Sequence, residues 1–200
     1  MQTQFIYYPD DILFTNDERI IAHKIQEIPY YITPNQLSYI KEWTGLRFKN
    51  IIFNSDIDNW SRNTTEFYNR IIGKKHLVFL IEDEDGERFG YYLNTEVNRR
   101  HNIYTKPTDE QSFHFNLVSN RRFDSPTNFE IYDIQQGGCY LFDSESDKMI
   151  SIGNIMLYKQ NMSWKSECFS NHFFCTHGRV YPLCGKPTFN PIKIIVIQLV

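Results

Sequence analysis

The chain has 200 residues, enough for one large domain or two very small ones. It carries 21 Lys and Arg against 24 Asp and Glu, and the net charge of −3 argues against bulk attraction to nucleic acid or an anionic membrane. No apolar stretch approaches the roughly 18 residues of a membrane-spanning helix, and the N-terminus lacks a secretory leader pattern. We therefore expect a cytoplasmic protein without a transmembrane segment, whose four cysteines are thiols.

The apolar residues favour strands over helices. The chain has 24 Ile, 16 Phe and 13 Tyr, but 11 Leu and one Ala. β-Branched and aromatic side chains fit the half-buried surface of a sheet, whereas Ala and Leu favour helices. The composition predicts a β-rich fold.

The first clear signal for the start of a helix comes at Thr33 and Pro34. Before it, residues 1–32 mix short apolar pieces with Asp and Asn, and we expect an N-terminal extension that packs on a domain of residues 33–200. Thr33 can cap a helix, Pro34 suits the first helical position, and Gly45 is a typical stop. This pattern predicts a helix over 34–44.

A short strand and a second helix are expected next. Apolar residues at 48 and 51–53 predict the strand. Apolar residues at helical spacing then lead to Gly73, and either Ser61 or Asn63 is a suitable cap for this second helix.

From residue 76 the apolar period changes to two, which is typical of strands. Residues 83–86 form a turn, and we interpret the acidic cluster between Glu82 and Glu87 as a solvated hairpin tip. Residues 95–109 are interpreted as a polar loop and residues 160–190 as a long irregular segment. The predicted fold class is α+β and β-dominated, an antiparallel β-sandwich flanked by two or more helices. Its strands are expected at 76–82, 88–94, 112–118, 129–132, 139–142, 149–152, 155–158 and 192–200.

Five candidate metal ligands lie in the irregular segment. Zinc accepts thiolate and imidazole ligands, so a zinc-binding module is one hypothesis, although the spacing matches no standard zinc motif. Ordinary buried thiols are a second, and a redox-responsive protein whose cysteines react with oxidant or cross-link is a third. Apart from zinc we expect no cofactor. The five residues are Cys168, His172, Cys175, His177 and Cys184.

No motif in the chain points to catalysis. The nucleophile elbow G-x-S-x-G and phosphate-binding glycine loops are absent from the sequence. We therefore expect no catalytic residues and no enzyme activity, with a hydrolase built on the sandwich as a weaker alternative. Basic pairs are scattered along the chain, so no nucleic-acid partner is expected.

The order of several motifs resembles the TLDc domain, from about Ile51 to the C-terminus. A helix ending at Gly73 precedes the hairpin LIEDEDGERFGYY, and the strand SFHFNLV follows. The segment SIGNIMLY resembles a glycine-containing motif of the family, and CGKPTFN with IKIIVIQLV resembles its closing cysteine and last strand. The segment EWTGLRFKNIIFNSDID is similar to divergent members from single-celled eukaryotes.

The chain also departs from the family pattern. The glycine run is reduced to Gly153, and the closing strand lacks the family's acidic residue. Two segments, around Cys168 and around Cys184, compete for the place of the same family cysteine.

The resemblance implies a non-catalytic module that binds a protein partner. It implies a role in oxidative-stress resistance, in regulation of the vacuolar proton-pumping ATPase (V-ATPase), or in both. It also implies that Gly90 and Gly153 take part in binding. The residues themselves favour a packing role, because Gly90 lies within a predicted strand and Gly153 at a strand end.

Overall fold

The structure, a computed structural model, describes residues 32–98, 104–105, 111–133, 137–169 and 177–200. The chain divides into two compact units, Met1–Thr33 and Pro34–Val200. The second unit is described below. The extension expected at residues 1–32 lies almost wholly outside the described residues, so its packing on the domain stays a prediction.

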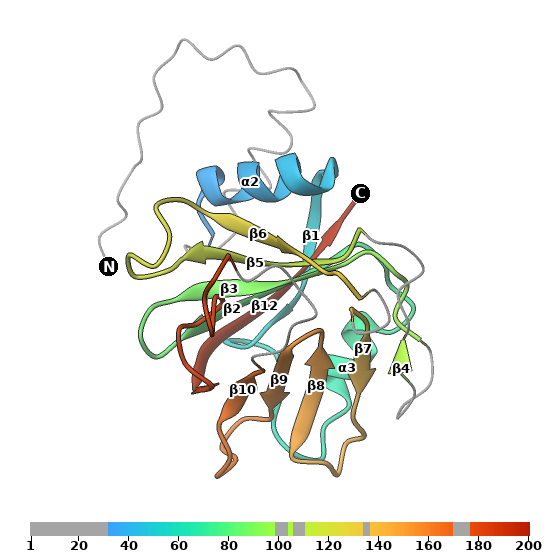
Figure 1. The fold of residues 1–200 in the computed structure, drawn as a ribbon. Helices are drawn as coiled ribbons and strands as arrows, with labels where there is room; N and C mark the ends of the chain where they lie inside the picture. The colour runs from blue at the N-terminus through green and yellow to red at the C-terminus, as the bar shows by residue number, and fades with distance from the viewer. Residues whose placement is uncertain (1–31, 99–103, 106–110, 134–136, 170–176) are drawn as a thin grey trace, which may run out of the picture. The chain divides into compact units, whose positions relative to one another are not determined.

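Two antiparallel sheets form most of the second unit (Figure 1), which confirms the predicted β-dominated sandwich with helices. Its described helices are α2 (Pro34–Thr44) and α3 (Glu66–Ile71). The first sheet has the order β1 (Phe48–Asn54), β12 (Pro191–Leu199), β2 (Leu77–Asp83), β3 (Arg88–Leu93), β5 (Phe113–Val118) and β6 (Thr127–Glu130). The second has the order β11 (Thr188–Phe189), β10 (Ser166–Cys168), β9 (Ile155–Tyr158), β8 (Lys148–Ile152), β7 (Cys139–Leu141) and β4 (Tyr104–Thr105).

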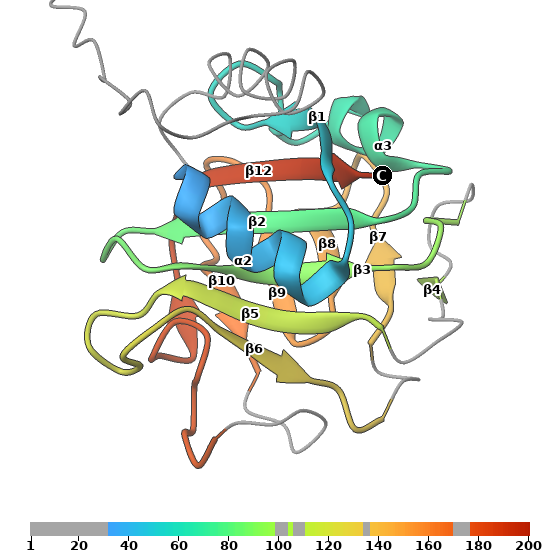
Figure 2. The same cartoon turned by 90° about the horizontal axis from the view of Figure 1, so that it is seen from above.

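The first sheet is covered on both faces. The second sheet packs against one face, and α2 crosses the other (Figures 1 and 2). Side chains alternate between the two faces along a strand. On β2, Phe79 and Ile81 belong to the core between the sheets, whereas Val78 and Leu80 are buried on the α2 side. This double burial explains why β2 has an almost continuous apolar sequence.

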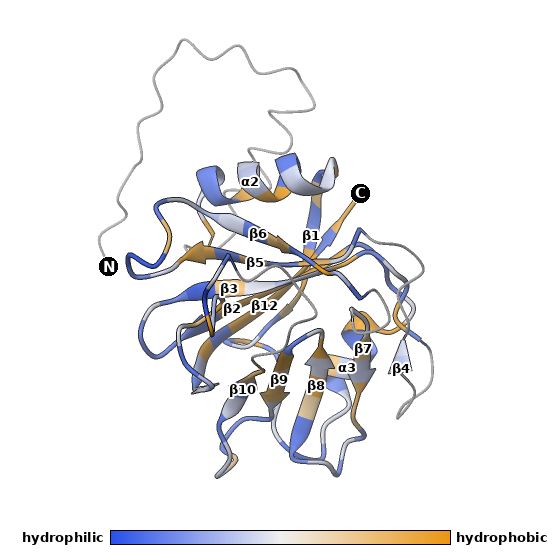
Figure 3. Ribbon diagram, in the orientation of Figure 1, coloured by the Kyte–Doolittle hydropathy of each residue, from blue (hydrophilic) through white to orange (hydrophobic). Residues whose placement is uncertain are grey.

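Aromatic rings hold α2 on its face of the sheet. The Trp43 ring lies 6.0 Å from the ring of Phe113 and 6.1 Å from the ring of Phe115, both on β5. Figure 3 shows apolar residues on the side of α2 that faces the sheet. The predicted helix over 34–44 is therefore confirmed. Its apolar side covers the face of the first sheet that points away from the second sheet.

Three local predictions are wrong. The predicted loop 95–109 contains the short strand β4, and the predicted irregular segment 160–190 contains β10 and β11. Strands of two or three residues are too short to show an apolar period. The N-cap position of α3 is occupied by Thr65, whose side chain makes no capping hydrogen bond, and not by Ser61 or Asn63.

A buried tyrosine links the two sheets. The Tyr91 hydroxyl on β3 donates a hydrogen bond to the carbonyl oxygen of Gly137, which precedes β7. Tyr91 is fully buried, so its hydroxyl needs a protein partner. This bond ties the middle of the first sheet to the start of β7.

Replacement of Tyr91 by Phe should lower the free energy of unfolding by about 1–3 kcal/mol, because the Gly137 carbonyl loses this buried donor. In urea unfolding, the loss appears as a lower urea concentration at the midpoint, while the dependence of the unfolding free energy on urea concentration stays the same. Tyr39→Phe on α2 is the matched control, since the Tyr39 ring contacts Trp43 and the substitution keeps that ring. Equal stability of the two variants would contradict the linking role.

Candidate functional site

Gly153 occupies the turn between β8 and β9. The strands pair through Ile152 and Ile155, so the turn consists of Gly153 and Asn154 alone. Gly153 has a φ of +50°, a conformation that glycine adopts without strain. A two-residue hairpin turn with a positive φ at its first position strongly favours glycine there.

This turn packs closely against the first sheet. A methyl group added to Gly153 would lie 2.5 Å from Cε1 of His114 and 3.0 Å from the Tyr91 ring. The backbone N–H of Asn154 donates to Nε2 of His114 at 3.2 Å. We call Gly153, Asn154, His114 and Tyr91 the sheet junction, because they join the β8–β9 turn to β3 and β5.

The chemistry of His114 follows from its burial. The ring is 1% exposed. Burial lowers the pKa of His114 to about 3, although a hydrogen bond with the Gly90 backbone acts in the opposite direction. The ring is therefore neutral, and because Nε2 accepts a bond, its proton resides on Nδ1.

Gly90, the other glycine named by the family resemblance, lies in the interior of the first sheet. It pairs with Leu80 on β2 and with Phe115 on β5. A methyl group at Gly90 would lie 1.8 Å from the Phe79 carbonyl oxygen and 2.8 Å from Cζ of Phe115. The structure thus places Gly90 where a ring and a neighbouring strand approach the backbone closely, as the packing interpretation expects.

Two of the five candidate metal ligands lie in contact. The Sγ atoms of Cys168, at the end of β10, and Cys184, shortly before β11, are 3.1 Å apart. Both thiols are free and buried. The pairing of β10 with β11 brings the two segments together, although 16 positions separate the cysteines in the chain. The two segments that compete for one family cysteine are therefore neighbours in space.

The acidic turn between β2 and β3 lies beside this thiol pair. Asp83 is fully buried and Glu87 is 3% exposed, so the predicted solvated tip is wrong for these two residues. Asp83 Oδ1 accepts the backbone N–H groups of Asp85 and Glu87, each at 3.0 Å, and this shapes the turn. Glu84 and Asp85 are exposed, as the prediction expects.

Two cations from later in the chain neutralise the turn. The Arg122 guanidinium forms a bidentate pair with Glu87, with Nη1 2.6 Å from Oε1, and donates to the Leu183 carbonyl oxygen at 2.9 Å. Nζ of Lys186 lies 2.5 Å from Asp85 and 3.4 Å from Asp83. We call Cys168, Cys184, Asp83, Glu87, Arg122 and Lys186 the cysteine cluster.

Burial and charge affect the cationic and thiol groups of the cluster differently. Burial raises the pKa of Cys168 well above its usual range. Hydrogen bonding with Cys168 lowers the pKa of Cys184, although burial opposes this shift. Burial also opposes the charged form of Lys186, but the neighbouring carboxylates outweigh it and raise the pKa of Lys186. Cys184 is therefore the thiol of the pair that ionises more readily.

Of the three remaining candidate ligands, the structure describes His177 alone. The His177 ring lies against Phe129, with ring centroids 5.6 Å apart. His172 and Cys175 lie outside the described residues, so the zinc hypothesis stays a prediction. Two thiolates on a tetrahedral zinc ion would be about 3.8 Å apart, and the pair in the structure is closer. The described residues contain no group of three or more His, Cys, Asp or Glu arranged for a metal ion.

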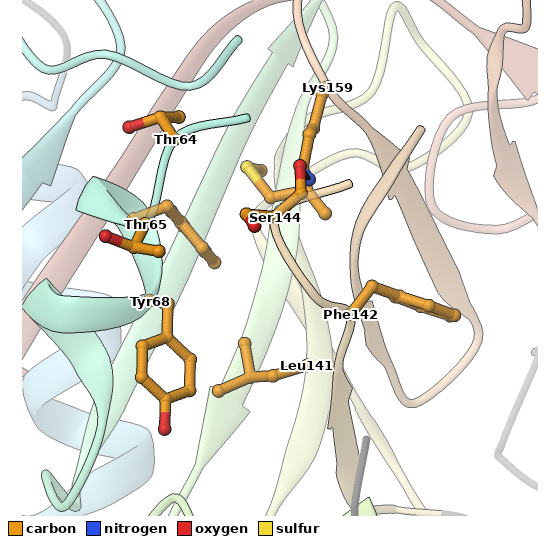
Figure 4. A pocket seen from close by; sticks show the side chains of 9 residues that line it. Thr64, Thr65, Tyr68, Leu141, Phe142, Ser144 and Lys159 are labelled. Atoms are coloured by element: carbon orange, nitrogen blue, oxygen red, sulfur yellow. Dashed lines mark hydrogen bonds between the residues drawn. The ribbon is translucent and has the colours of Figure 1, made fainter. Parts of the chain in front are cut away.

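A small cavity lies between the α3 region and the β7–β8 hairpin (Figure 4). Its volume of about 20 Å³ has room for about one water molecule. Thr65 and Tyr68 face Leu141 across it. Lys159 also lines it and donates to the carbonyl oxygens of Asp143 and Ser144 at 2.8 and 2.7 Å.

Sequence reasoning found the two glycines and the two cysteines, but it missed their partners. Alternation along 112–118 placed His114 opposite the phenylalanines, yet the pattern carries no signal that this face meets a second sheet. Arg122 is 35 positions from Glu87, and Lys186 is 101 positions from Asp85. Only the tertiary fold shows these contacts.

The chain matches a known protein family. The sequence profile described as the TLDc domain matches residues 14–195. No curated protein matches the chain. Within the described residues, no helix is long and apolar enough to cross a membrane.

Gly90→Ala should destabilise the fold by about 3 kcal/mol or more, because the added methyl group meets backbone atoms of β2 that cannot move independently. Thermal unfolding followed by circular dichroism measures the loss. Gly86→Ala is the matched control in the same hairpin: it has open space around it and a φ of +78°, so its cost should be about 1–2 kcal/mol. A Gly90→Ala variant as stable as the control would contradict the close packing.

Acid should weaken the fold through His114. The pKa of His114 is lowered to about 3 in the folded chain and is about 6.5 in the unfolded chain, so the unfolded state binds the proton first as pH falls. The contribution of His114 to the free energy of unfolding is complete above about pH 6.5 and is lost toward pH 3. Over this range the free energy of unfolding falls by up to about 1.4 kcal/mol per pH unit.

Urea unfolding of the wild-type chain and of His114→Gln between about pH 7 and about pH 4.5 isolates this contribution from that of the carboxylates. Glutamine is neutral throughout, and its amide oxygen can accept the Asn154 N–H. We expect the variant to have the shallower pH slope. Identical slopes would show that His114 does not stay neutral in the folded chain.

Proposed function

Because this chain belongs to the TLDc domain family, we propose that it is a non-catalytic protein-interaction module that acts in the cytoplasm. The match over residues 14–195 carries the proposal, since it includes nearly the whole chain. The partner we propose is the V-ATPase, and the role is resistance to oxidative stress through control of that pump.

The close packing of the fold supports a role as a docking module. The first sheet is enclosed by α2 and the second sheet, and the sheet junction joins the two sheets through buried, hydrogen-bonded side chains. A surface that changes little on binding loses little conformational entropy, which favours affinity. The two family glycines then support binding indirectly, since they allow the close packing that keeps the surface in shape.

Exposed apolar side chains supply candidate contacts. Trp164, in the turn between β9 and β10, is 65% exposed. Tryptophan is enriched among the residues that dominate binding energy in protein interfaces, whereas valine is under-represented. We therefore propose Trp164 as an anchor for the partner. Other large apolar residues among those the structure describes are also exposed, namely Ile57, Tyr132, Phe169, Val180, Ile192 and Val200.

Trp164→Ala should weaken binding of the chain to the purified V-ATPase of the same organism about tenfold or more. Surface plasmon resonance on the immobilised chain measures affinity, and a native gel of the pump measures its state of assembly. Val180→Ala is the matched control, because Val180 is also 65% exposed and the substitution removes less apolar surface.

Two results would count against the proposal. Absence of binding by the folded wild-type chain to the purified pump would reject the V-ATPase as partner. Equal affinities of the wild-type chain and Trp164→Ala would keep the partner and reject Trp164 as its anchor. Circular dichroism of each variant ensures that a loss of binding does not come from unfolding.

A further inference from the structure

We propose that Cys168 and Cys184 form a two-electron redox site, at which a hydroperoxide converts the two thiols into a disulfide. This inference goes beyond partner binding and does not depend on which protein the chain binds. It rests on the position of the two sulfur atoms and on the charges that surround them.

The fold holds the two sulfurs ready for bond formation. Their separation of 3.1 Å has to shorten to about 2.05 Å in a disulfide, a movement of about 1 Å. The pairing of β10 with β11 fixes the backbone of Cys168, whose N–H donates to the Pro187 carbonyl oxygen at 2.8 Å. Cys184 lies outside helices and strands, so its side of the pair can make this small shift.

The cysteine cluster also assigns different roles to the two thiols. Arg122 stabilises negative charge on both sulfurs, whereas Asp83 opposes it. In its thiol form, Cys184 Sγ donates a hydrogen bond to Cys168 Sγ at 3.1 Å, and once Cys184 is ionised the Cys168 S–H is placed to donate in return. Because Cys184 lies outside helices and strands whereas Cys168 ends β10, we assign Cys184 as the first nucleophile and Cys168 as the thiol that resolves the intermediate.

The reaction balances without a cofactor. The Cys184 thiolate attacks one peroxide oxygen, the O–O bond breaks, and the leaving hydroxide takes up a proton to become water. The product is a sulfenic acid on Cys184. The Cys168 sulfur then attacks the Cys184 sulfur, loses its proton and expels the second oxygen as water. Two thiols and one hydrogen peroxide yield one disulfide and two water molecules, and the two sulfurs supply both electrons.

Cys139 provides an internal comparison. It is fully buried on β7, and burial raises the pKa of its thiol to about 12. The Thr105 side chain acts in the opposite direction by hydrogen bonding. Since the thiolate is the reactive form, Cys139 should stay reduced under conditions that oxidise the pair. Both members of the pair are also buried, so we expect oxidation to follow local opening and to be slower than that of an exposed thiol.

The test uses the full chain and hydrogen peroxide. After mild peroxide treatment and alkylation of the remaining thiols, peptide mapping by mass spectrometry should find Cys168 joined to Cys184 and Cys139 alkylated. Before alkylation, the intact mass should fall by about 2 Da, the mass of two hydrogen atoms, and dithiothreitol should restore it. Cys139→Ser/Cys175→Ser retains only the proposed pair and should behave in the same way.

The oxidised chain should also be more stable, with a melting temperature raised by about 5–10 °C, because the bridge closes a loop of about 15 residues. Cys168→Ala should abolish both the cross-link and this rise. Peptide mapping of the wild-type chain decides the question even if that variant folds poorly.

Three outcomes would overturn the proposal: no loss of thiols under peroxide, pairing of Cys175 with Cys168 or Cys184, or a mass increase from sulfinic acid without a cross-link. The first would show that the pair does not react with peroxide. The second would assign the redox site to another pair of cysteines. The third would show that Cys168 does not reach the oxidised sulfur.

Discussion

The structure depends on the enclosure of the first sheet from both sides. Because α2 covers one face and the second sheet covers the other, each side chain on the central strands has to fit a closed space. Buried polar groups then have to find partners inside the protein. Gly90, Gly153 and the neutral ring of His114 are consequences of this one constraint: two glycines allow close approach, and one imidazole accepts a backbone hydrogen bond.

The same enclosure separates two regions with different chemistry. At the sheet junction the groups are neutral, and they hold the sheets together. In the cysteine cluster, cations and carboxylates surround a pair of thiols, and Arg122 and Lys186 tie the acidic hairpin to the segment that carries Cys184. Oxidation of the pair would therefore add a covalent link to a region that ion pairs already connect. Partner binding through the exposed surface and thiol chemistry in the cluster are separable properties of one chain.

Much of the fold was predictable because its signals are local. The Thr33-Pro34 start and the Gly45 stop predicted α2 with the observed bounds, and the apolar period predicted the longer strands. The partners in the candidate site were not predictable. Asp83 and Glu87 have the composition of a solvated turn, and the cations that pair with them when buried, Arg122 and Lys186, are distant in the sequence. Likewise, the spacing of Cys168 and Cys184 gives no hint of contact, because β10 and β11 are too short to show a period.

The junction between the sheets is the central claim, and the ionisation state of His114 tests it most directly. In nitrogen-15 NMR of the imidazole groups, the enclosed ring should be neutral at about pH 5, with the proton on Nδ1 and with Nε2 unprotonated and accepting a bond from Asn154. A His114 that takes up a proton near pH 6.5, as an exposed imidazole does, would show that the space between the two sheets is open to water and would contradict the account.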